Sequence, residues 1–76
     1  MEENTMKYPV FIIKEKNSDY GVTVPDLPGC IATGDTLSEV EQHIREAIEF
    51  HIEGMRADGL TIPAPRSRVE YVSVAA

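Results

Sequence analysis

The stretch from Tyr20 to Leu37 reads Y-G-V-T-V-P-D-L-P-G-C-I-A-T-G-D-T-L, and it decides the fold. It opens with the period-two alternation that is typical of a half-buried strand. A tight turn follows, because proline fixes φ and removes a backbone donor while glycine allows a positive φ. The chain then returns as a second strand from Cys30 to Thr33. The residues predicted to form this structural motif are Pro25, Asp26, Pro28, Gly29, Cys30, Gly34, Asp35 and Thr36.

A helix is predicted directly after this strand, from Leu37 to about Ala57. Thr36 stands three residues before Glu39, which is the spacing of a capping box. Gly59 follows at the position of a left-handed helix cap. Within the helix, apolar residues recur at three- and four-residue steps, so they form one stripe that faces the sheet. The stripe consists of Leu37, Val40, Ile44, Ala47, Ile48, His51, Ile52 and Met55.

Two further strands are predicted on either side of these elements. Lys7 to Glu15 and Val69 to Val74 are both rich in β-branched and aromatic residues. A right-handed crossover through the helix would lay the last strand parallel to the strand before the helix. The sequence therefore predicts an α+β fold of order βββαβ, with a four-stranded mixed sheet and one helix on one face. Residues 1–76 are expected to form a single domain, with residues 1–6 disordered.

The quoted stretch and the acidic run E-A-I-E-F-H-I-E-G-M behind it resemble the amino-terminal domain of HicB-family antitoxins. The resemblance runs from about Tyr8 to Val74. It implies a partial ribonuclease H-like fold without nuclease activity, and a protein that binds and neutralises a small basic HicA-type ribonuclease toxin by protein contact. Many family members also carry a carboxy-terminal helix-turn-helix or ribbon-helix-helix segment that binds operator DNA. The sequence ends at Ala76 without such a segment, so direct DNA binding by this chain alone is not expected.

Composition favours a basic protein partner over nucleic acid. Thirteen acidic residues against seven Lys and Arg give a net charge of −6 and a pI near 4.7. One cysteine cannot form an internal disulfide, and no apolar run is long enough for a membrane span, so a cytoplasmic protein is expected. The acidic surface is expected on the helix, although charge runs are often only solvated faces. The partner-binding residues predicted there are Glu46, Glu49, Phe50 and Glu53.

The aspartates do not form a convincing catalytic pattern. Ribonuclease H chemistry needs carboxylates that converge on paired metal ions, and the first strand contains none. Asp19, Asp26 and Asp35 stand at strand ends, where turn chemistry is their ordinary role. We therefore predict no catalytic residues and no enzyme activity. The alternative is an orphan degenerate small enzyme or ligand-binding module that uses the Asp26 to Asp35 edge.

The histidines and the cysteine give no signal for a metal or a cofactor. His43 and His51 lie roughly 12 Å apart along a helix, too far to share a zinc ion. His51 falls on the apolar stripe, which indicates a packed side chain. Cys30 has no base near it in sequence and is interpreted as a small buried hydrophobe. No metal or cofactor site is predicted.

Both faces of the predicted sheet are apolar, because alternate residues of the first strand are apolar on each side. One helix covers only one face, so the other face needs a second layer. We expect a homodimer or higher oligomer, built on the uncovered sheet face or on a strand edge. The interface residues predicted for it are Phe11 and Ile13, with Phe50 as a lesser candidate. The alternative is that the connector from Thr61 to Ser67 shields Phe11 and Ile13, although short loops rarely cover a sheet.

Overall fold

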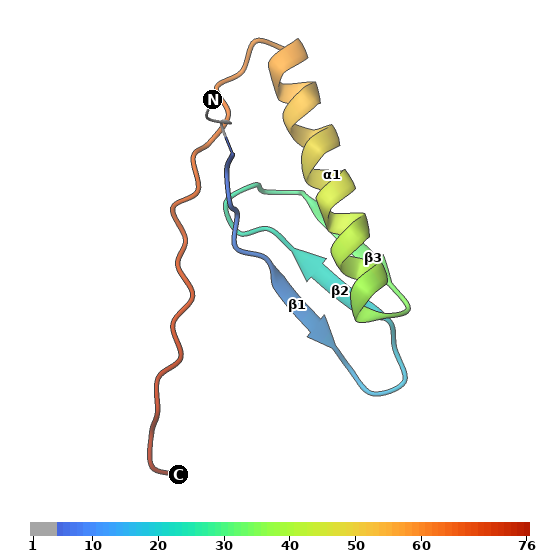
Figure 1. Cartoon of the computed structure of the whole chain (residues 1–76), viewed down its shortest axis with the longest axis vertical. Helices are drawn as coiled ribbons and strands as arrows, with labels where there is room; N and C mark the ends of the chain where they lie inside the picture. The colour runs from blue at the N-terminus through green and yellow to red at the C-terminus, as the bar shows by residue number, and fades with distance from the viewer. Residues whose placement is uncertain (1–4) are drawn as a thin grey trace.

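Three strands and one helix form the regular secondary structure of residues 5–76 (Figure 1). The computed structural model describes residues 5–76, so residues 1–4 of the segment predicted to be disordered, residues 1–6, lie outside the described residues. The elements are β1 (Phe11–Lys14), β2 (Tyr20–Thr23), β3 (Ile31–Gly34) and α1 (Leu37–Ala57). The sheet is antiparallel with the order β1-β2-β3, and α1 packs across one face of it, over β3 and β2. The predicted α+β class and the predicted helix are confirmed.

The turn between β2 and β3 is held by its own backbone. The Val24 amide donates to the Cys30 carbonyl at 3.2 Å, and the Leu27 amide donates to the Val24 carbonyl at 3.0 Å. The Cys30 amide in turn donates to the Leu27 carbonyl at 3.0 Å. Gly29 has a φ of 85°, in the left-handed region that glycine adopts without strain. These bonds fold the turn around Leu27, whose side chain is completely buried.

One cluster of buried apolar side chains joins the sheet, this turn and the helix. Ile12 of β1 packs against the cluster, as do Tyr8 and Val10 of the segment before β1. Burying a side chain the size of Leu27 stabilises the fold by about 1.5–3 kcal/mol, so this small core depends on each member. The buried residues are Val22, Val24, Leu27, Cys30, Val40 and Ile44.

The helix begins and ends at the predicted residues. Thr36 is the N-cap, and its Oγ1 accepts a hydrogen bond from the Glu39 amide at 3.0 Å. The Glu39 carboxylate reaches back one residue further than in a standard capping box, to the Asp35 amide at 2.8 Å. The Glu39 carboxylate thus provides a hydrogen-bond acceptor for the amide just before the helix, and it places a negative charge in the first helical turn.

A Schellman motif ends the helix. The Leu60 amide donates to the Met55 carbonyl at 2.9 Å, and the Gly59 amide donates to the Arg56 carbonyl at 3.0 Å. Gly59 has the positive φ of 72° that this motif requires. The chain therefore turns sharply away from the helix axis into the connector.

The predicted fourth strand is not confirmed by this structure. Residues 58–76 contain no strand, so the described sheet is three-stranded and wholly antiparallel. A strand exists only where its amides and carbonyls bond a neighbouring strand. After Ser67 the chain runs along the molecule but diverges from β1 (Figure 1). The partial ribonuclease H-like fold is likewise not confirmed by the described residues, which form three of the four predicted strands.

Gly34 allows the closest approach between the sheet and the helix. A Cβ atom at Gly34 would lie 2.7 Å from the Val40 nitrogen and 2.9 Å from the Val40 Cα. These are backbone atoms, which cannot rotate aside as the end of a side chain could. Glycine is therefore required here because of space, in addition to the turn that follows.

We expect Gly34→Ala to lower the free energy of unfolding by about 1–3 kcal/mol, because α1 must move off the sheet. Urea denaturation followed by helical circular dichroism measures the change. Gly54→Ala is the matched control, since a Cβ there meets nothing within 4 Å. It should raise the stability by about 0.5–1 kcal/mol. Equal stabilities of Gly34→Ala and the parent protein would contradict the close approach.

Candidate protein-binding surfaces

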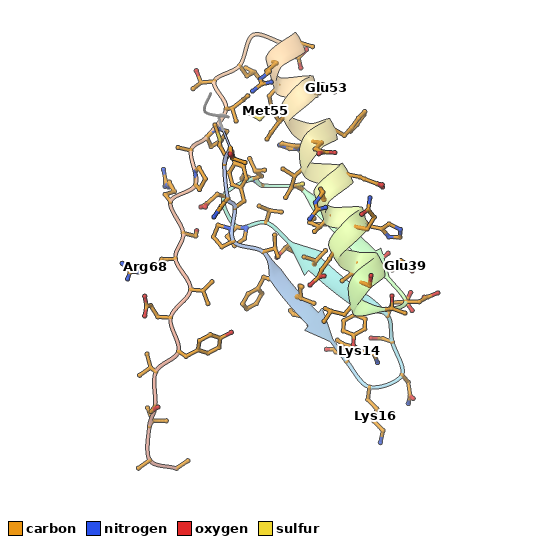
Figure 2. The ribbon with its side chains drawn as sticks, in the orientation of Figure 1. Lys14, Lys16, Glu39, Glu53, Met55 and Arg68 are labelled. Atoms are coloured by element: carbon orange, nitrogen blue, oxygen red, sulfur yellow. The ribbon has the colours of Figure 1, made fainter. Side chains whose placement is uncertain are left out.

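Three glutamates of α1 form an acidic helix face, defined as Glu46, Glu49 and Glu53. They follow one another at three- and four-residue steps, which places them on one side of the helix. All three are exposed (Glu53 is labelled in Figure 2). Gln42 donates from Nε2 to the Glu46 carboxylate at 2.8 Å. Within residues 5–76 none of the three carboxylates forms an ion pair, so their negative charge is not neutralised by the fold.

Phe50 lies beside the acidic helix face. Its side chain is 79% exposed, which is unusual for a phenylalanine of a packed helix. It lines a hollow of about 470 Å³ together with Ile31, His51 and Met55. The hollow therefore joins the helix to β3, and Phe50 borders both the acidic helix face and the edge of the sheet.

The sheet face opposite the helix, here called the open face, is apolar and uncovered. Phe11, Ile13 and Ile31 are 61%, 52% and 65% exposed. Phe11 pairs with Thr23 and Thr23 pairs with Ile31, so these side chains form a row across all three strands. The connector does not shield Phe11 and Ile13, as their exposure shows. Homo-oligomerisation through these residues stays a prediction.

A groove of about 1070 Å³ lies between α1 and the segment that precedes β1. Its apolar lining comes from both sides, and charged side chains of both signs, Arg45 and Glu49 among them, border it. The sequence did not predict this groove, because its position depends on how residues 5–10 lie against the helix. The apolar lining residues are Met6, Tyr8, Val10, Ile44, Ile48, Ile52 and Ile62.

Asp26 anchors the connector to the turn between β2 and β3. Its carboxylate accepts hydrogen bonds from the Arg66 amide and the Ser67 amide, both at 2.9 Å, and from the Ser67 hydroxyl at 2.7 Å. These bonds, the Ser67 hydroxyl first among them, hold the pKa of Asp26 below its usual value. The Tyr8 hydroxyl donates to the Pro63 carbonyl and gives a second attachment. Burial, followed by the negative charge of Asp26, raises the pKa of Tyr8.

His43 covers part of the outer edge of β3. The Val24 to Cys30 hydrogen bond fixes the alternation of the antiparallel ladder, so the backbone of Thr33 points away from β2. The Thr33 carbonyl lies 2.6 Å from Nδ1 of His43, which donates to it. His43 therefore serves the packing of helix on sheet and occupies an edge carbonyl that another strand would otherwise use.

The remaining residues weighed for chemistry are not gathered into one site. Cys30 is buried in the core, as predicted, and burial raises the pKa of its thiol. His51 is half-buried at the hollow, in keeping with a packed histidine. Asp19 and Asp35 are exposed, and within residues 5–76 no group of three or more histidine, cysteine or acidic side chains could hold a metal ion. No helix of the described part of the chain is long and apolar enough to cross a membrane.

Fold and surfaces together define a small α+β domain whose exposed features suit contact with another protein. Residues 8–75 match the family described as the HicB-like antitoxin of bacterial toxin-antitoxin systems, and the chain belongs to this family. The family indicates an antitoxin role, and an antitoxin implies a toxin as partner.

The chain is also similar to proteins of a phage, an archaeon and a cyanobacterium. An uncharacterised 14.9 kDa protein from the rep-hol intergenic region of Haemophilus phage HP1 is 46% identical over 68 residues, which cover 90% of this chain and 50% of that protein. A UPF0150 protein of Thermoplasma acidophilum is 41% identical over 69 residues, covering 91% and 97%. One from Synechocystis is 37% identical over 67 residues, covering 88% and 85%. The chain thus spans half of the phage protein and nearly all of the archaeal one.

We expect the Asp26 anchor to open at acid pH. The folded pKa of Asp26 is lowered, so the anchor stabilises fully above the ordinary pKa of an aspartate and is lost as the pH falls through the lowered value. Nuclear magnetic resonance should then show Arg66 and Ser67 becoming mobile in acid while α1 persists. Asp26→Ala should release them at neutral pH, whereas the control Asp19→Ala should not. Ordered Arg66 and Ser67 in Asp26→Ala would contradict the anchor.

Proposed function

We propose that this chain neutralises a small basic HicA-type ribonuclease by direct protein contact, with the acidic helix face as the docking surface. Membership of the antitoxin family supports the role. The observation that carries the choice of surface is the row of exposed glutamates without ion pairs on α1. A net charge of −6 favours a cationic partner.

The acidic helix face and Phe50 would contribute differently to binding. Exposed charges are individually worth little in affinity, about 0–1 kcal/mol per pair, but they accelerate encounter with an oppositely charged protein. An exposed aromatic side chain that enters a pocket of the partner slows dissociation instead. Phe50 borders the acidic helix face, so one surface offers both steering and an apolar anchor.

The alternative, a small enzyme or ligand-binding module at the Asp26 to Asp35 edge, has less support. The Asp26 carboxylate already accepts three hydrogen bonds from the connector. Asp35 lies at the start of α1, where its amide is bonded by Glu39. Within residues 5–76, no group of three or more histidine, cysteine or acidic side chains that could hold a metal ion lies at this edge.

The first experiment identifies the partner and tests whether this chain inhibits it. The reading frame beside the gene should encode a short, strongly basic protein, and purification from the native host should recover that protein in complex with this chain. Adding this chain should then suppress the ribonuclease activity of the purified partner. A recovered basic neighbour whose activity is unaffected by this chain would overturn the proposal.

Charge removal tests the surface. Replacing Glu46, Glu49 and Glu53 by Gln should slow association at low salt by about tenfold or more and flatten its salt dependence, because steering is lost. Stopped-flow kinetics with the purified toxin measures both. The control variant carries Glu15→Gln, Asp19→Asn and Glu70→Gln, which removes the same charge away from α1. If both variants associate at the same rate, only net charge matters and the acidic helix face is a solvated surface.

Phe50→Ala should act on the other rate constant. We expect dissociation of the toxin to become about tenfold faster or more, with association little changed, because an apolar anchor is lost without a change of charge. Surface plasmon resonance separates the two rates. Phe11→Ala, on the open face, is the control and should leave both rates near those of the parent protein. Equal effects of the two substitutions would remove Phe50 from the docking surface.

A further inference from the structure

The last part of the chain has the composition of a strand, but it pairs with no strand of the described sheet. We call residues 68–76 the tail. Its large apolar side chains are exposed, with Val69 at 60%, Tyr71 at 96%, Val72 at 80% and Val74 at 78%. Such β-branched and aromatic residues are enriched in strands because they pack on a pleated, half-buried surface. In this structure the tail lies extended away from the body of the molecule (Figure 1).

The tail starts from a fixed position. The Asp26 anchor holds Arg66 and Ser67. The hydrogen bond from Tyr8 to Pro63 holds the connector at a point nearer to the helix. Beyond Ser67, the ion pair that the structure shows joins two tail residues, Arg68 and Glu70, to each other. The chain is thus ordered up to the base of the tail and then leaves its own sheet.

The complementary feature is the outer edge of β1. The alternation that turns Thr33 outward in β3 also directs the backbone groups of Phe11 and Ile13 towards β2. The backbone groups of Ile12 and Lys14 therefore point outward, where the described sheet has no further strand. An open edge next to an apolar face is a template for another strand.

The dimensions of the molecule show that the tail is not packed into a compact body in a single copy. The radius of gyration is 14.6 Å and the longest extent is 46 Å, whereas a compact chain of this length has a radius of about 11 Å. An extended tail of nine residues spans about 30 Å, enough to cover a four-residue edge strand of about 13 Å. The tail is long enough to serve as a strand, and its large apolar side chains are exposed in a single copy.

Matching unpaired features favour a second copy of the chain as the occupant of the β1 edge. The tail carries Arg68 and Glu70, which pair with each other, so it brings no net charge to the contact. One chain also carries both halves of the missing contact, and a two-fold axis satisfies both halves in both copies at once.

We propose that two copies of this chain exchange their tails, with each tail pairing as a strand along the outer edge of β1 in the other copy. Each sheet then gains a fourth strand in trans, and the valine and tyrosine side chains of the tail gain a surface to cover. The Asp26 anchor sets where the tail leaves its own body. This assembly does not depend on the identity of the toxin.

Mass and isotope labelling together test the exchange. Light scattering at micromolar concentration should give twice the 8.4 kDa of one chain. In a sample that mixes labelled and unlabelled copies, isotope-filtered spectra should show contacts between Tyr71 or Val72 of one copy and Ile12 or Lys14 of the other. A monomer, or tail contacts within one copy only, would overturn the proposal.

Two substitutions separate the tail from the open face. Val72→Pro removes a backbone donor from the tail and should give a monomer with unchanged helical circular dichroism, because the tail lies outside the core. Ala76→Pro, at the end of the tail, is the control and should remain dimeric. Phe11→Asp should also remain dimeric. A dimer that Phe11→Asp dissociates and Val72→Pro leaves intact would place the interface on the open face and contradict strand exchange.

Discussion

The burial of Leu27 is the interaction on which the rest of the structure depends. Three backbone hydrogen bonds fold the turn between β2 and β3 around this side chain, and the turn thereby carries it into one cluster with Val40 of α1. The sheet has only three short strands, and few side chains are fully buried. A core this small stays cooperative only if the turn, the sheet and the helix share it. The same turn presents Asp26 on its outer side, so the residue that anchors the connector is positioned by the packing of its neighbour.

Local patterns in the sequence were enough to predict the helix and the turn. Thr36, Glu39 and Gly59 take part in hydrogen bonds that join residues close together in the sequence. Their positions in the sequence therefore indicated both ends of α1. The burial of Leu27 was not predicted, because a residue between Asp26 and Pro28 is assigned to a turn by composition although its hydrogen bonds direct it inward. The role of Gly34 was predicted only as a turn, since the nearness of the Val40 backbone depends on the angle between helix and sheet.

The fourth strand and the connector show where local reasoning stops. Val69 to Val74 has the composition of a strand, but pairing is a property of two segments, and the described residues provide no partner for it. Asp26 and Ser67 meet across 41 positions of sequence, and no spacing rule links them. The acidic helix face was the part of the candidate site that could be predicted, because helical periodicity alone places its three glutamates together and outside the core.

The hydrogen bond between His43 and Thr33 has a consequence for how this protein associates. A sheet with two free edges can accept a strand on each side, and copies that add at both edges grow into fibres without a natural end. Here the imidazole of His43, on α1, donates a hydrogen bond to the Thr33 carbonyl at the outer edge of β3. An incoming strand would need that carbonyl as an acceptor. An incoming strand would therefore lack one acceptor at the β3 edge, whereas the outward backbone groups of Ile12 and Lys14 stay open at the β1 edge of the described sheet. Pairing of copies through their sheets is thus biased towards the β1 edge, which favours a closed pair over a growing fibre.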